Sequence, residues 1–362
     1  MNYAVVMAGG TGKRLWPLSR KNRPKQVLKL LAGHNLLEQC IDRLVPIFDV
    51  RNILVLTNAD YIDLVRETAA QVPYQNVIGE PVVRDTAGAV GLAATILTKF
   101  DPDATVAVVT ADQIIEPAEA LQQALTDALS FVNSHPDYLV TFGIRPTFPS
   151  TQLGYIKCGK GKHIGECKNP LHPVEAFSEK PTLETAQEYI ESGQYFWNSG
   201  MFVWKAKRVL ALLDHHLPES TVPLQRIKAD WDGPNQVTTL KEWFPKLPKI
   251  SIDFAVMEKA DYVRAIRLDC RWLDMGSFAA LADIISSDKN NNVVVASHSE
   301  LLDCRNSIFV TEQKDHLIAA IGLENMVVAH SPDATLICHV DQTQRLKELL
   351  AVVEKNTADK FL

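Results

Sequence analysis

The residues best suited to chemistry lie near the start of the chain, in the segment AGGTGKRLWPLSRKNRPKQ at positions 8–26. Its glycines at positions 9, 10 and 12 allow backbone N–H groups to approach an anion closely. The side chains of Arg14 and Lys25 can balance phosphate charge. Residues 13–29 hold seven cations and no acid, in a chain whose formal net charge is −6. This contrast predicts a local anionic ligand, with a solvated basic loop as the alternative.

Two common phosphate-binding motifs do not fit this segment. A P-loop requires a further glycine upstream of the Gly-Lys pair and Ser or Thr after it, but Met7 and Arg14 stand at these positions. A dinucleotide-binding fingerprint requires a third glycine where Leu15 stands. Glycines alone are also compatible with a structural turn, so their basic neighbours carry the hypothesis.

The elements that must position these residues follow a regular order in the first part of the chain. Strands are predicted at 3–7, 52–56, 105–110 and 139–142, and helices at 35–44, 61–71, 86–99 and 117–132. This alternation predicts a doubly wound, mostly parallel sheet with its ligands beyond the carboxyl ends of the strands. The glycines at 9–12 and Asp112 both follow predicted strands, so we expect them to share one site.

Beyond Phe142 the pattern changes to shorter β-like pieces. Further strands are predicted at 154–158, 174–177, 201–204 and 263–268, and helices near 182–192, 205–216, 277–286 and 341–353. The run Asn290-Asn291-Asn292 marks a break. We therefore expect two domains, a large α/β domain over 1–287 and a small β-rich domain over 288–362 that ends in a helix.

One cluster of potential metal ligands lies outside this site. Cys158, His163, Cys167 and His172 fall within a short stretch and could form a Cys2His2 zinc site. The segment between them is rich in glycine and lysine and lies between two strand-like runs, which favours a hairpin tip. The sequence leaves both interpretations open.

Composition limits the possible partners and the compartment. An acidic protein with a sequence pI near 5.9 is not expected to bind nucleic acid or an anionic membrane surface. The six cysteines are scattered without CxxC pairs, the start of the chain does not have the form of a secretory signal, and no apolar run is long enough to span a membrane. We expect a cytoplasmic protein.

Further short motifs occur along the rest of the chain. They are Arg84-Asp85-Thr86-Ala87, Ala111-Asp112, Gly154-Tyr155-Ile156, Glu179-Lys180-Pro181, Trp197-Asn198-Ser199-Gly200-Met201-Phe202, Ser251-Ile252-Asp253 and Trp272-Leu273-Asp274-Met275-Gly276-Ser277. Together with Leu15-Trp16-Pro17-Leu18-Ser19-Arg20 and Pro24-Lys25-Gln26, this order resembles the sugar-1-phosphate nucleotidyltransferases, and the mannose-1-phosphate guanylyltransferases in particular. Asp85, Gly88 and Gln113 stand where that family more often has Asn, Pro and His. These departures bear on the choice of base more than on the reaction.

The resemblance implies a fold, a reaction and roles for individual residues. The fold is a Rossmann-like, mixed but mostly parallel sheet followed by a small β-helix-like domain, through which a homodimer could form. The reaction transfers GMP from GTP to mannose 1-phosphate and requires Mg²⁺. Arg14 and Lys25 are the implied catalytic residues, and Asp112 and Asp274 the implied metal ligands. The implied nucleotide-binding residues are Ala8, Gly9, Gly10, Thr11, Gly12, Arg14, Arg84, Asp85, Gly88 and Asp112, and the implied sugar-binding residues are Gly154, Glu179, Lys180, Asn198 and Asp253.

The chemistry is consistent with these residue types. A phosphate monoester has a second pKa of about 6 and is already largely ionised at neutral pH, so its attack on GTP needs no general base. Two alternatives remain: another nucleotide or sugar 1-phosphate, and a silent subunit that only binds nucleotide sugars. A silent subunit should have lost Lys25, Arg14 or an acidic ligand, and all are present. Longer family members also carry a phosphomannose isomerase domain; these residues show no resemblance to it, and we do not expect isomerase activity.

Overall fold

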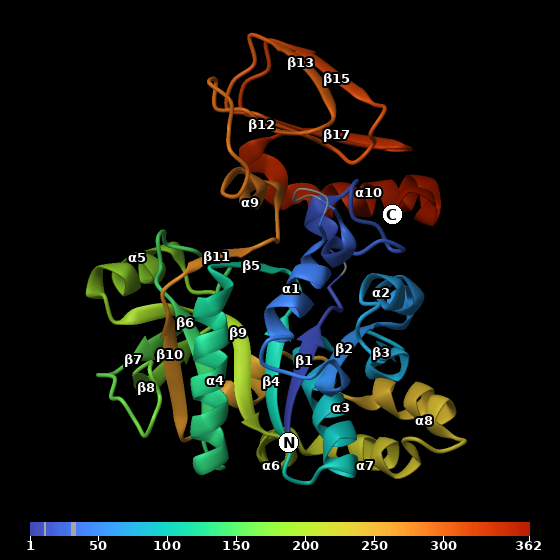
Figure 1. Cartoon of the computed structure of the whole chain (residues 1–362). Helices are drawn as coiled ribbons and strands as arrows, with labels where there is room; N and C mark the ends of the chain where they lie inside the picture. Colours follow the sequence, from blue (N-terminus) through green and yellow to red (C-terminus); the bar gives the residue numbers. More distant parts are fainter. Residues whose placement is uncertain (11, 30–33) are drawn as a thin grey trace.

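A computed structural model of the chain describes residues 1–10, 12–29 and 34–362 (Figure 1). The strands are β1 (Asn2–Met7), β2 (Ile53–Asn58), β3 (Val77–Glu80), β4 (Thr105–Thr110), β5 (Gln113–Glu116), β6 (Leu139–Ile144), β7 (Tyr155–Cys158), β8 (Leu171–Ser178), β9 (Tyr195–Lys205), β10 (Val263–Leu268), β11 (Arg271–Asp274), β12 (Val293–Val295), β13 (His298–Leu302), β14 (Ile308–Thr311), β15 (Leu317–Ile321), β16 (Met326–Ser331) and β17 (Ala334–His339). The α-helices are α1 (Leu36–Leu44), α2 (Ile62–Thr68), α3 (Asp85–Phe100), α4 (Ala118–Ser134), α5 (Leu183–Ser192), α6 (Ala206–His216), α7 (Thr221–Asp230), α8 (Gln236–Trp243), α9 (Phe278–Ala282) and α10 (Leu346–Thr357).

The larger part of the chain is built on one nine-stranded sheet with the order β3-β2-β1-β4-β9-β6-β10-β8-β7. The first four strands in this order are parallel, as are β6 and β10. β9 runs antiparallel to its neighbours β4 and β6, and β8 runs antiparallel to β10. The predicted mixed, mostly parallel Rossmann-like sheet is confirmed.

Helices cover both faces of this sheet because its central strands are apolar on both sides. In β1, Ala4 and Val6 belong to the core cluster shared with α1 and α4, whereas Tyr3 and Val5 belong to the cluster shared with α3 and α6. The helix α1 begins at a capping box in which Asn35 and Glu38 bond to each other's backbone N–H groups, as predicted. Because the parallel strands run in one direction, their carboxyl ends lie on the same side of the sheet, beneath the C-terminal elements in Figure 1.

The C-terminal lobe, comprising β12 to β17 and α10, is a short coil of strands. The strands β12, β14 and β16 pair in parallel. β13 and β15, which alternate with these strands along the sequence, pair in parallel with each other. Because alternate strands pair, the chain winds as a coil, which confirms the predicted β-helix-like architecture. The predicted start of the last helix is wrong: residues Val340–Arg345 form a 3-10 helix, and α10 begins only at Leu346.

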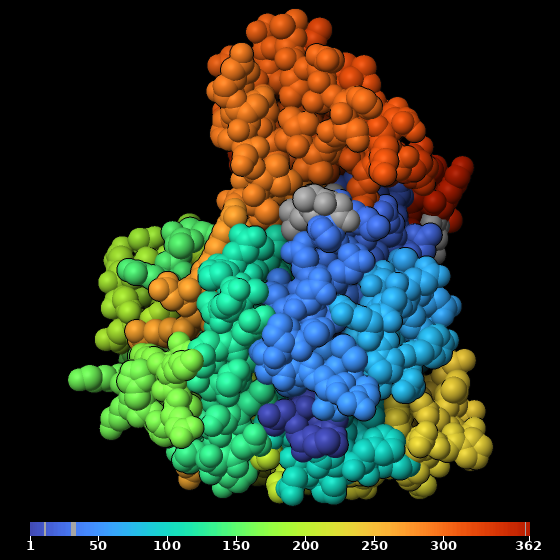
Figure 2. Space-filling model, in the orientation of Figure 1, coloured from blue at the N-terminus to red at the C-terminus, as the bar shows by residue number. Residues whose placement is uncertain are grey.

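The C-terminal lobe rests on the segment that follows β1. One core cluster combines Leu15, Trp16 and Leu18 with Val327 and Ala329 of β16. In the space-filling view, the orange and red lobe stands above the α/β part and contacts blue N-terminal residues (Figure 2). Among the described residues, no helix has the length and apolarity needed to cross a membrane.

Candidate functional site

The glycine loop leaves the carboxyl end of β1 in a position set by its neighbours. The backbone N–H of Ala8 donates to the carbonyl of Leu56 at 2.7 Å, and the Gln26 side chain donates to the carbonyl of Ala8. The buried Gln26 is one member of the Pro24-Lys25-Gln26 motif, so the motif itself anchors the loop.

Gly12 has a structural reason to be glycine. Its φ of 67° is in the left-handed region, and a Cβ atom there would lie 2.6 Å from the Cβ of Lys25. The missing side chain allows the backbone of the loop to lie against Lys25. Thr11, which was predicted to bind nucleotide with Ala8, Gly9, Gly10 and Gly12, lies outside the described residues.

Lys25 joins two carboxylates that are far apart in sequence. Its Nζ lies 2.6 Å from Oδ2 of Asp112 and 3.8 Å from Oδ1 of Asp274. Antiparallel pairing of β5 with β11 brings the two acids together: Asp274 is the register partner of Gln113, and the Met275 N–H donates to the Asp112 carbonyl at 3.0 Å. The structure therefore brings one of the two predicted catalytic residues, Lys25, together with both predicted metal ligands.

The members of this trio shift one another's pKa values. Burial alone lowers the pKa of Lys25, but the carboxylates of Asp112 and Asp274 outweigh it and leave the pKa above its ordinary value. Burial, and then the charge of Asp112, raise the pKa of Asp274. Two carboxylates this close repel each other unless a cation lies between them, and in this structure the Lys25 ammonium is that cation.

A second cluster contains all five predicted sugar-binding residues. Nδ2 of Asn198 donates to Oδ1 of Asp253 at 2.7 Å, and its backbone N–H donates to the carbonyl of Gly154 at 2.8 Å. A Cβ atom on Gly154 would overlap the carboxylate of Glu179, and that carboxylate pairs with Lys180 at 2.5 Å. Burial and the charge of Glu179 raise the pKa of Asp253 to about 6, against a smaller lowering by the Asn198 hydrogen bond.

A cavity of about 440 Å³ lies beside the acidic pair, and none of the five predicted sugar-binding residues lines it. Its lining includes Arg14, Asp274 from the acidic pair, and Trp197, which precedes Asn198 in β9. Arg14 donates to Oε1 of Gln152 at 3.1 Å, close in sequence to Gly154. The predicted catalytic arginine thus lines the same cavity as Asp274.

The predicted base-side residues lie at the start of α3. The Arg84 side chain donates to the carbonyl of Pro245, and a Cβ on Gly88 would lie 2.7 Å from the Cβ of Arg84. Asp85 is exposed, has a φ of 60°, and its Oδ1 accepts the N–H of Thr86 at 2.8 Å. Gly88 is therefore a packing requirement for Arg84, while the Asp85 carboxylate accepts only from the next residue's N–H and remains open to the solvent.

Sequence reasoning missed Glu80, which ends β3 on this same side. Its side chain is 8% exposed, and a Cβ on Gly9 would lie 3.4 Å from its Oε2. A single glutamate after a short apolar run matches no motif, so nothing in the pattern marks it. The signal that could have found it is position, because Glu80 follows the strand run that precedes the Arg84-Asp85-Thr86-Ala87 motif.

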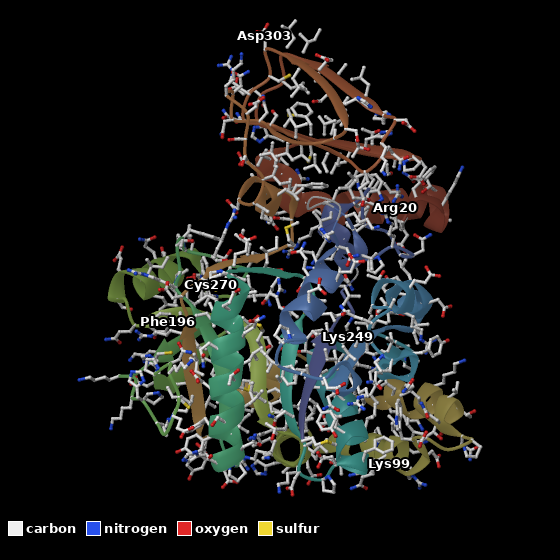
Figure 3. All side chains as sticks on the ribbon, in the orientation of Figure 1. Arg20, Lys99, Phe196, Lys249, Cys270 and Asp303 are labelled. Atoms are coloured by element: carbon white, nitrogen blue, oxygen red, sulfur yellow. The ribbon has the colours of Figure 1, made fainter. Side chains whose placement is uncertain are left out.

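The interpretation of residues 13–29 as one anion-binding stretch is only partly right. Arg20 pairs with Asp333 at 2.5 Å, and Arg23 donates to Glu312 at 3.0 Å. Both acids belong to the C-terminal lobe, and Arg20 lies at the junction beneath α10 (Figure 3). These cations hold the lobe, whereas Arg14 lines the cavity and Lys25 pairs with the two acids.

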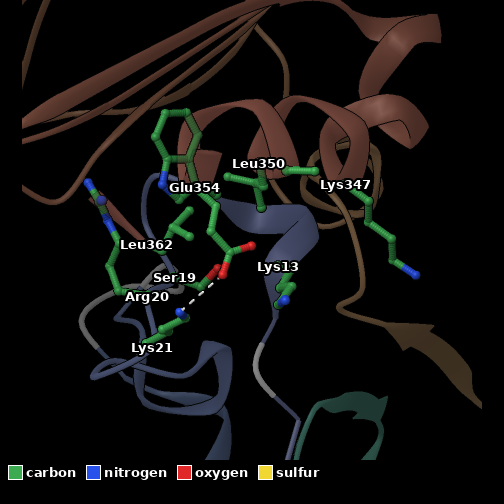
Figure 4. Close-up of a pocket in the computed structure, with 10 residues that line it drawn as sticks. Lys13, Ser19, Arg20, Lys21, Lys347, Leu350, Glu354 and Leu362 are labelled. Carbon is green, nitrogen blue, oxygen red and sulfur yellow. Dashed lines mark ion pairs between the residues drawn. The ribbon is translucent and has the colours of Figure 1, made fainter. Parts of the chain in front are cut away.

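A second cavity, of about 350 Å³, lies between this basic segment and α10 (Figure 4). Lys21 reaches across it to Glu354 at 3.7 Å. The indole N–H of Trp16 donates to the carbonyl of Phe361 at 2.6 Å beside it. The end of the chain is therefore fastened to the loop that carries the predicted phosphate-binding residues.

The structure does not gather the four candidate zinc ligands. The Cys167 thiol lies 3.6 Å from the carbonyl of Asp127, and His172 Nδ1 lies 3.0 Å from the carbonyl of Gly159. Within the described residues, no group of three or more His, Cys, Asp or Glu side chains is arranged to hold a metal ion. The segment joins the antiparallel strands β7 and β8, as expected for a hairpin.

Comparisons with known proteins agree with this geometry. Residues 3–291 match the nucleotidyl transferase family, and residues 290–354 match the MannoseP isomerase/GMP-like beta-helix domain. A mannose-1-phosphate guanylyltransferase of Klebsiella pneumoniae is 34% identical over 100% of this chain and 76% of its own length. The xanthan biosynthesis protein XanB of Xanthomonas campestris is 37% identical over 97% of this chain and 73% of its own length.

A solved structure has the same fold throughout. The Thermus thermophilus protein described as a mannose-1-phosphate geranyltransferase superposes with a TM-score of 0.86 at 34% identity, covering 98% of this chain and 99% of that one. The chain belongs to the nucleotidyl transferase family, among the mannose-1-phosphate guanylyltransferases.

Proposed function

We propose that this chain transfers GMP from GTP to mannose 1-phosphate and releases GDP-mannose and pyrophosphate. An oxygen of the sugar phosphate attacks the α-phosphorus of GTP, and the bond from that phosphorus to the bridging oxygen of the β-phosphate breaks in line. The observation that carries the proposal is the contact of Lys25 with both Asp112 and Asp274, beside the glycine loop and next to the cavity that Arg14 and Asp274 line. A triphosphate on the glycine loop and a sugar phosphate near Asn198 would meet there.

The main task of this site is to position the phosphates and neutralise their charge. The nucleophile is largely ionised at neutral pH, so no side chain has to remove a proton. Lys25 would stabilise the charge that the reacting phosphates share, and Arg14 would hold the triphosphate. The raised pKa of Lys25 keeps this lysine protonated, as its role requires.

Enzymes of this family use a divalent cation, and the acidic pair has the donors for Mg²⁺. Asp112 and Asp274 present hard carboxylate oxygens and already share the Lys25 ammonium as a cationic partner, which supports this role. They would hold the Mg²⁺ ion, which when bound neutralises phosphate oxygens and favours departure of pyrophosphate.

The sugar cluster would select the acceptor. Glu179, Asn198 and Asp253 offer hydrogen-bond acceptors and a donor for sugar hydroxyls, and Lys180 offers charge for the sugar phosphate. On the other side of the reacting phosphates, Arg84, Asp85 and Gly88 would flank the base. The loop at 8–12 would lie between these two sides.

We further propose that the chain works in the cytoplasm as a homodimer formed through the C-terminal lobe. All six cysteines are free thiols, as expected in a reducing compartment. Leu302 and Ile321 are register partners on β13 and β15 and are 58% and 73% exposed. Light scattering at micromolar concentration should give twice the chain mass, and Ile321→Glu should shift it to the monomer. A monomeric wild-type chain would rule out the dimer.

A substrate panel tests the proposed activity. The purified chain is assayed for pyrophosphate release with GTP, ATP, UTP, CTP and dTTP, each with mannose 1-phosphate and with glucose 1-phosphate. We expect GTP with mannose 1-phosphate to give the highest kcat/KM. A faster reaction with another pair would reassign the substrate, and no reaction with any pair would favour the silent binding subunit.

A further inference from the structure

Gln113 is a buried amide that directly follows Asp112. It is 5% exposed and begins β5. Nε2 of Gln113 donates to the carbonyl of Ser199 at 2.6 Å, and Oε1 accepts the indole N–H of Trp272 at 3.0 Å. Because a carbonyl can only accept and an indole N–H can only donate, these two partners fix the orientation of the amide. The backbone carbonyl of Gln113 also accepts from the Arg43 side chain at 2.9 Å, so three other elements hold this residue.

The two side-chain partners of Gln113 belong to both halves of the candidate site. Ser199 follows Asn198 of the sugar cluster in β9. Trp272 lies in β11, which ends at Asp274. β11 and β5 pair as a two-stranded ribbon above the large sheet (Figure 1). The amide therefore ties the strand that carries part of the sugar cluster to the ribbon that carries the acidic pair.

We propose that Gln113 is a positioning residue: its amide holds the acidic pair at a fixed distance from the sugar cluster. This inference rests on the proposed function and deepens it, because the sugar phosphate must reach the α-phosphorus of a triphosphate whose charge the acidic pair helps to hold. A displacement of about 1 Å between reacting groups can cost on the order of 10² in rate. Gln113 acts through its neighbours, since its own side chain is occupied by Ser199 and Trp272.

The two contacts decide which side chains can serve at this position. Methionine would fill a similar space but leave the Ser199 carbonyl and the Trp272 N–H buried without partners. Glutamate could accept from Trp272 but not donate to Ser199, and its charge would lie beside two carboxylates. Neutral histidine has one ring nitrogen that donates and one that accepts, so it could replace the amide. The departure from histidine at this position therefore concerns the acids and the sugar, not the choice of base as the sequence suggested.

The direct test compares Gln113→Met, Gln113→Glu and Gln113→His. In Gln113→Met and Gln113→Glu we expect kcat to fall by roughly tenfold to a hundredfold, while KM for GTP stays within about threefold because the glycine loop is unchanged. Titration calorimetry gives a readout besides turnover. Affinity for GDP-mannose, which would span both halves of the site, should fall by roughly fivefold or more, and affinity for GDP should not change. Gln113→His should keep all these values within about threefold of wild type at pH 8, where its ring is neutral.

A matched control is Asn292→Leu. Asn292 is also a buried amide, and its Nδ2 donates to the carbonyl of Cys304 at 2.9 Å in the C-terminal lobe. This change should lower the melting temperature but leave kcat and the affinity for GDP-mannose unchanged. A folded Gln113→Met variant with wild-type kcat and wild-type affinity for GDP-mannose would overturn the inference, and so would a Gln113→Glu variant as active as Gln113→His.

If Gln113→Met and Gln113→Glu do not fold, Trp272→Phe decides, because it removes only the indole N–H that the amide accepts. It should lower kcat and the affinity for GDP-mannose by a few-fold, and no change in either value would count against Gln113. A wild-type chain that uses no sugar 1-phosphate would refute the proposed function itself. That result does not depend on any substitution at position 113, so the two failures can be told apart.

Discussion

The ammonium nitrogen of Lys25 lies 2.6 Å from Oδ2 of Asp112. Lys25 comes from the motif that also anchors the glycine loop, and Asp112 follows β4 in the centre of the sheet. Their contact is therefore the point at which the nucleotide loop joins the acidic pair. We expect the same lysine to balance the acids before substrate binds and the phosphates during the reaction.

Replacement of Lys25 tests this double role. A fixed charge aimed at a transition state contributes on the order of 10²–10³ in rate, so Lys25→Ala should lower kcat by about this factor and change KM for GTP less. Steady-state pyrophosphate release measures both constants. Lys29→Ala is the control, because Lys29 belongs to the same basic segment as Lys25 but its side chain is exposed and does not line the cavity. A Lys25→Ala enzyme within threefold of the wild-type kcat would reduce Lys25 to a structural residue.

The acidic pair makes a prediction about additivity. Asp112→Ala and Asp274→Ala should each lower Mg²⁺-dependent turnover by about 10²–10³, and the double variant should be little worse, because both changes remove the same ion. Turnover is measured with and without EDTA, and thermal melting monitors the fold. Asp283→Asn changes another carboxylate of the same cavity and serves as the control. Full activity in either single variant would remove that residue from the metal site.

The raised pKa of Asp253 makes stability depend on pH. The folded chain holds this proton up to about pH 6, whereas the ordinary value is 3.8. The folded state therefore binds more protons in this range, and its stability falls as the pH rises from about 4 to 6. Asp253→Asn should remove this decline and raise stability at pH 8 by on the order of 1–2 kcal/mol, while weakening mannose 1-phosphate binding.

Denaturant unfolding at pH 4.5 and pH 8 measures this difference, and KM for mannose 1-phosphate measures the binding. Asp261→Asn, on the exposed segment before β10, is the control. A pH dependence of stability that is identical in wild type and Asp253→Asn would contradict the assignment. An unchanged KM would place the sugar elsewhere.

The C-terminal lobe should influence catalysis through the loop that it holds. Oε1 of Glu312 accepts from Arg23 at 3.0 Å and from the backbone N–H of Lys29 at 2.9 Å. Loss of a pair worth about 1 kcal/mol should lower the ordered fraction of the loop, and with it kcat/KM, by a few-fold. Glu312→Gln is compared with Glu324→Gln, which breaks a pair within the lobe between Glu324 and Arg305. Equal effects of the two changes on kcat/KM would show that the contact with the loop has no special role.

Sequence predicted β1 and α3 because each is a continuous apolar run, but it did not predict the short strands β3 and β5 or the helices α7 and α8. It also predicted the site residues by their order along the chain. It did not predict the β5–β11 pairing that joins Asp112 to Asp274, because a short antiparallel ribbon between distant segments has no local pattern. For the same reason the partners of Arg20 and Arg23 could not be foreseen: they are acids about 300 residues away in sequence. For Glu80 the sequence offers only its position after a strand-like run, because its burial is a tertiary property.

The most direct test of the account follows the phosphates of GTP. The wild-type chain is incubated with mannose 1-phosphate, Mg²⁺ and GTP that is radiolabelled at either the α- or the γ-phosphate, and the products are separated. The account predicts that the α-label appears in GDP-mannose and the γ-label in pyrophosphate. Label that stays in GTP, or α-label that is released as free GMP or GDP without sugar, would contradict the transfer of GMP to mannose 1-phosphate.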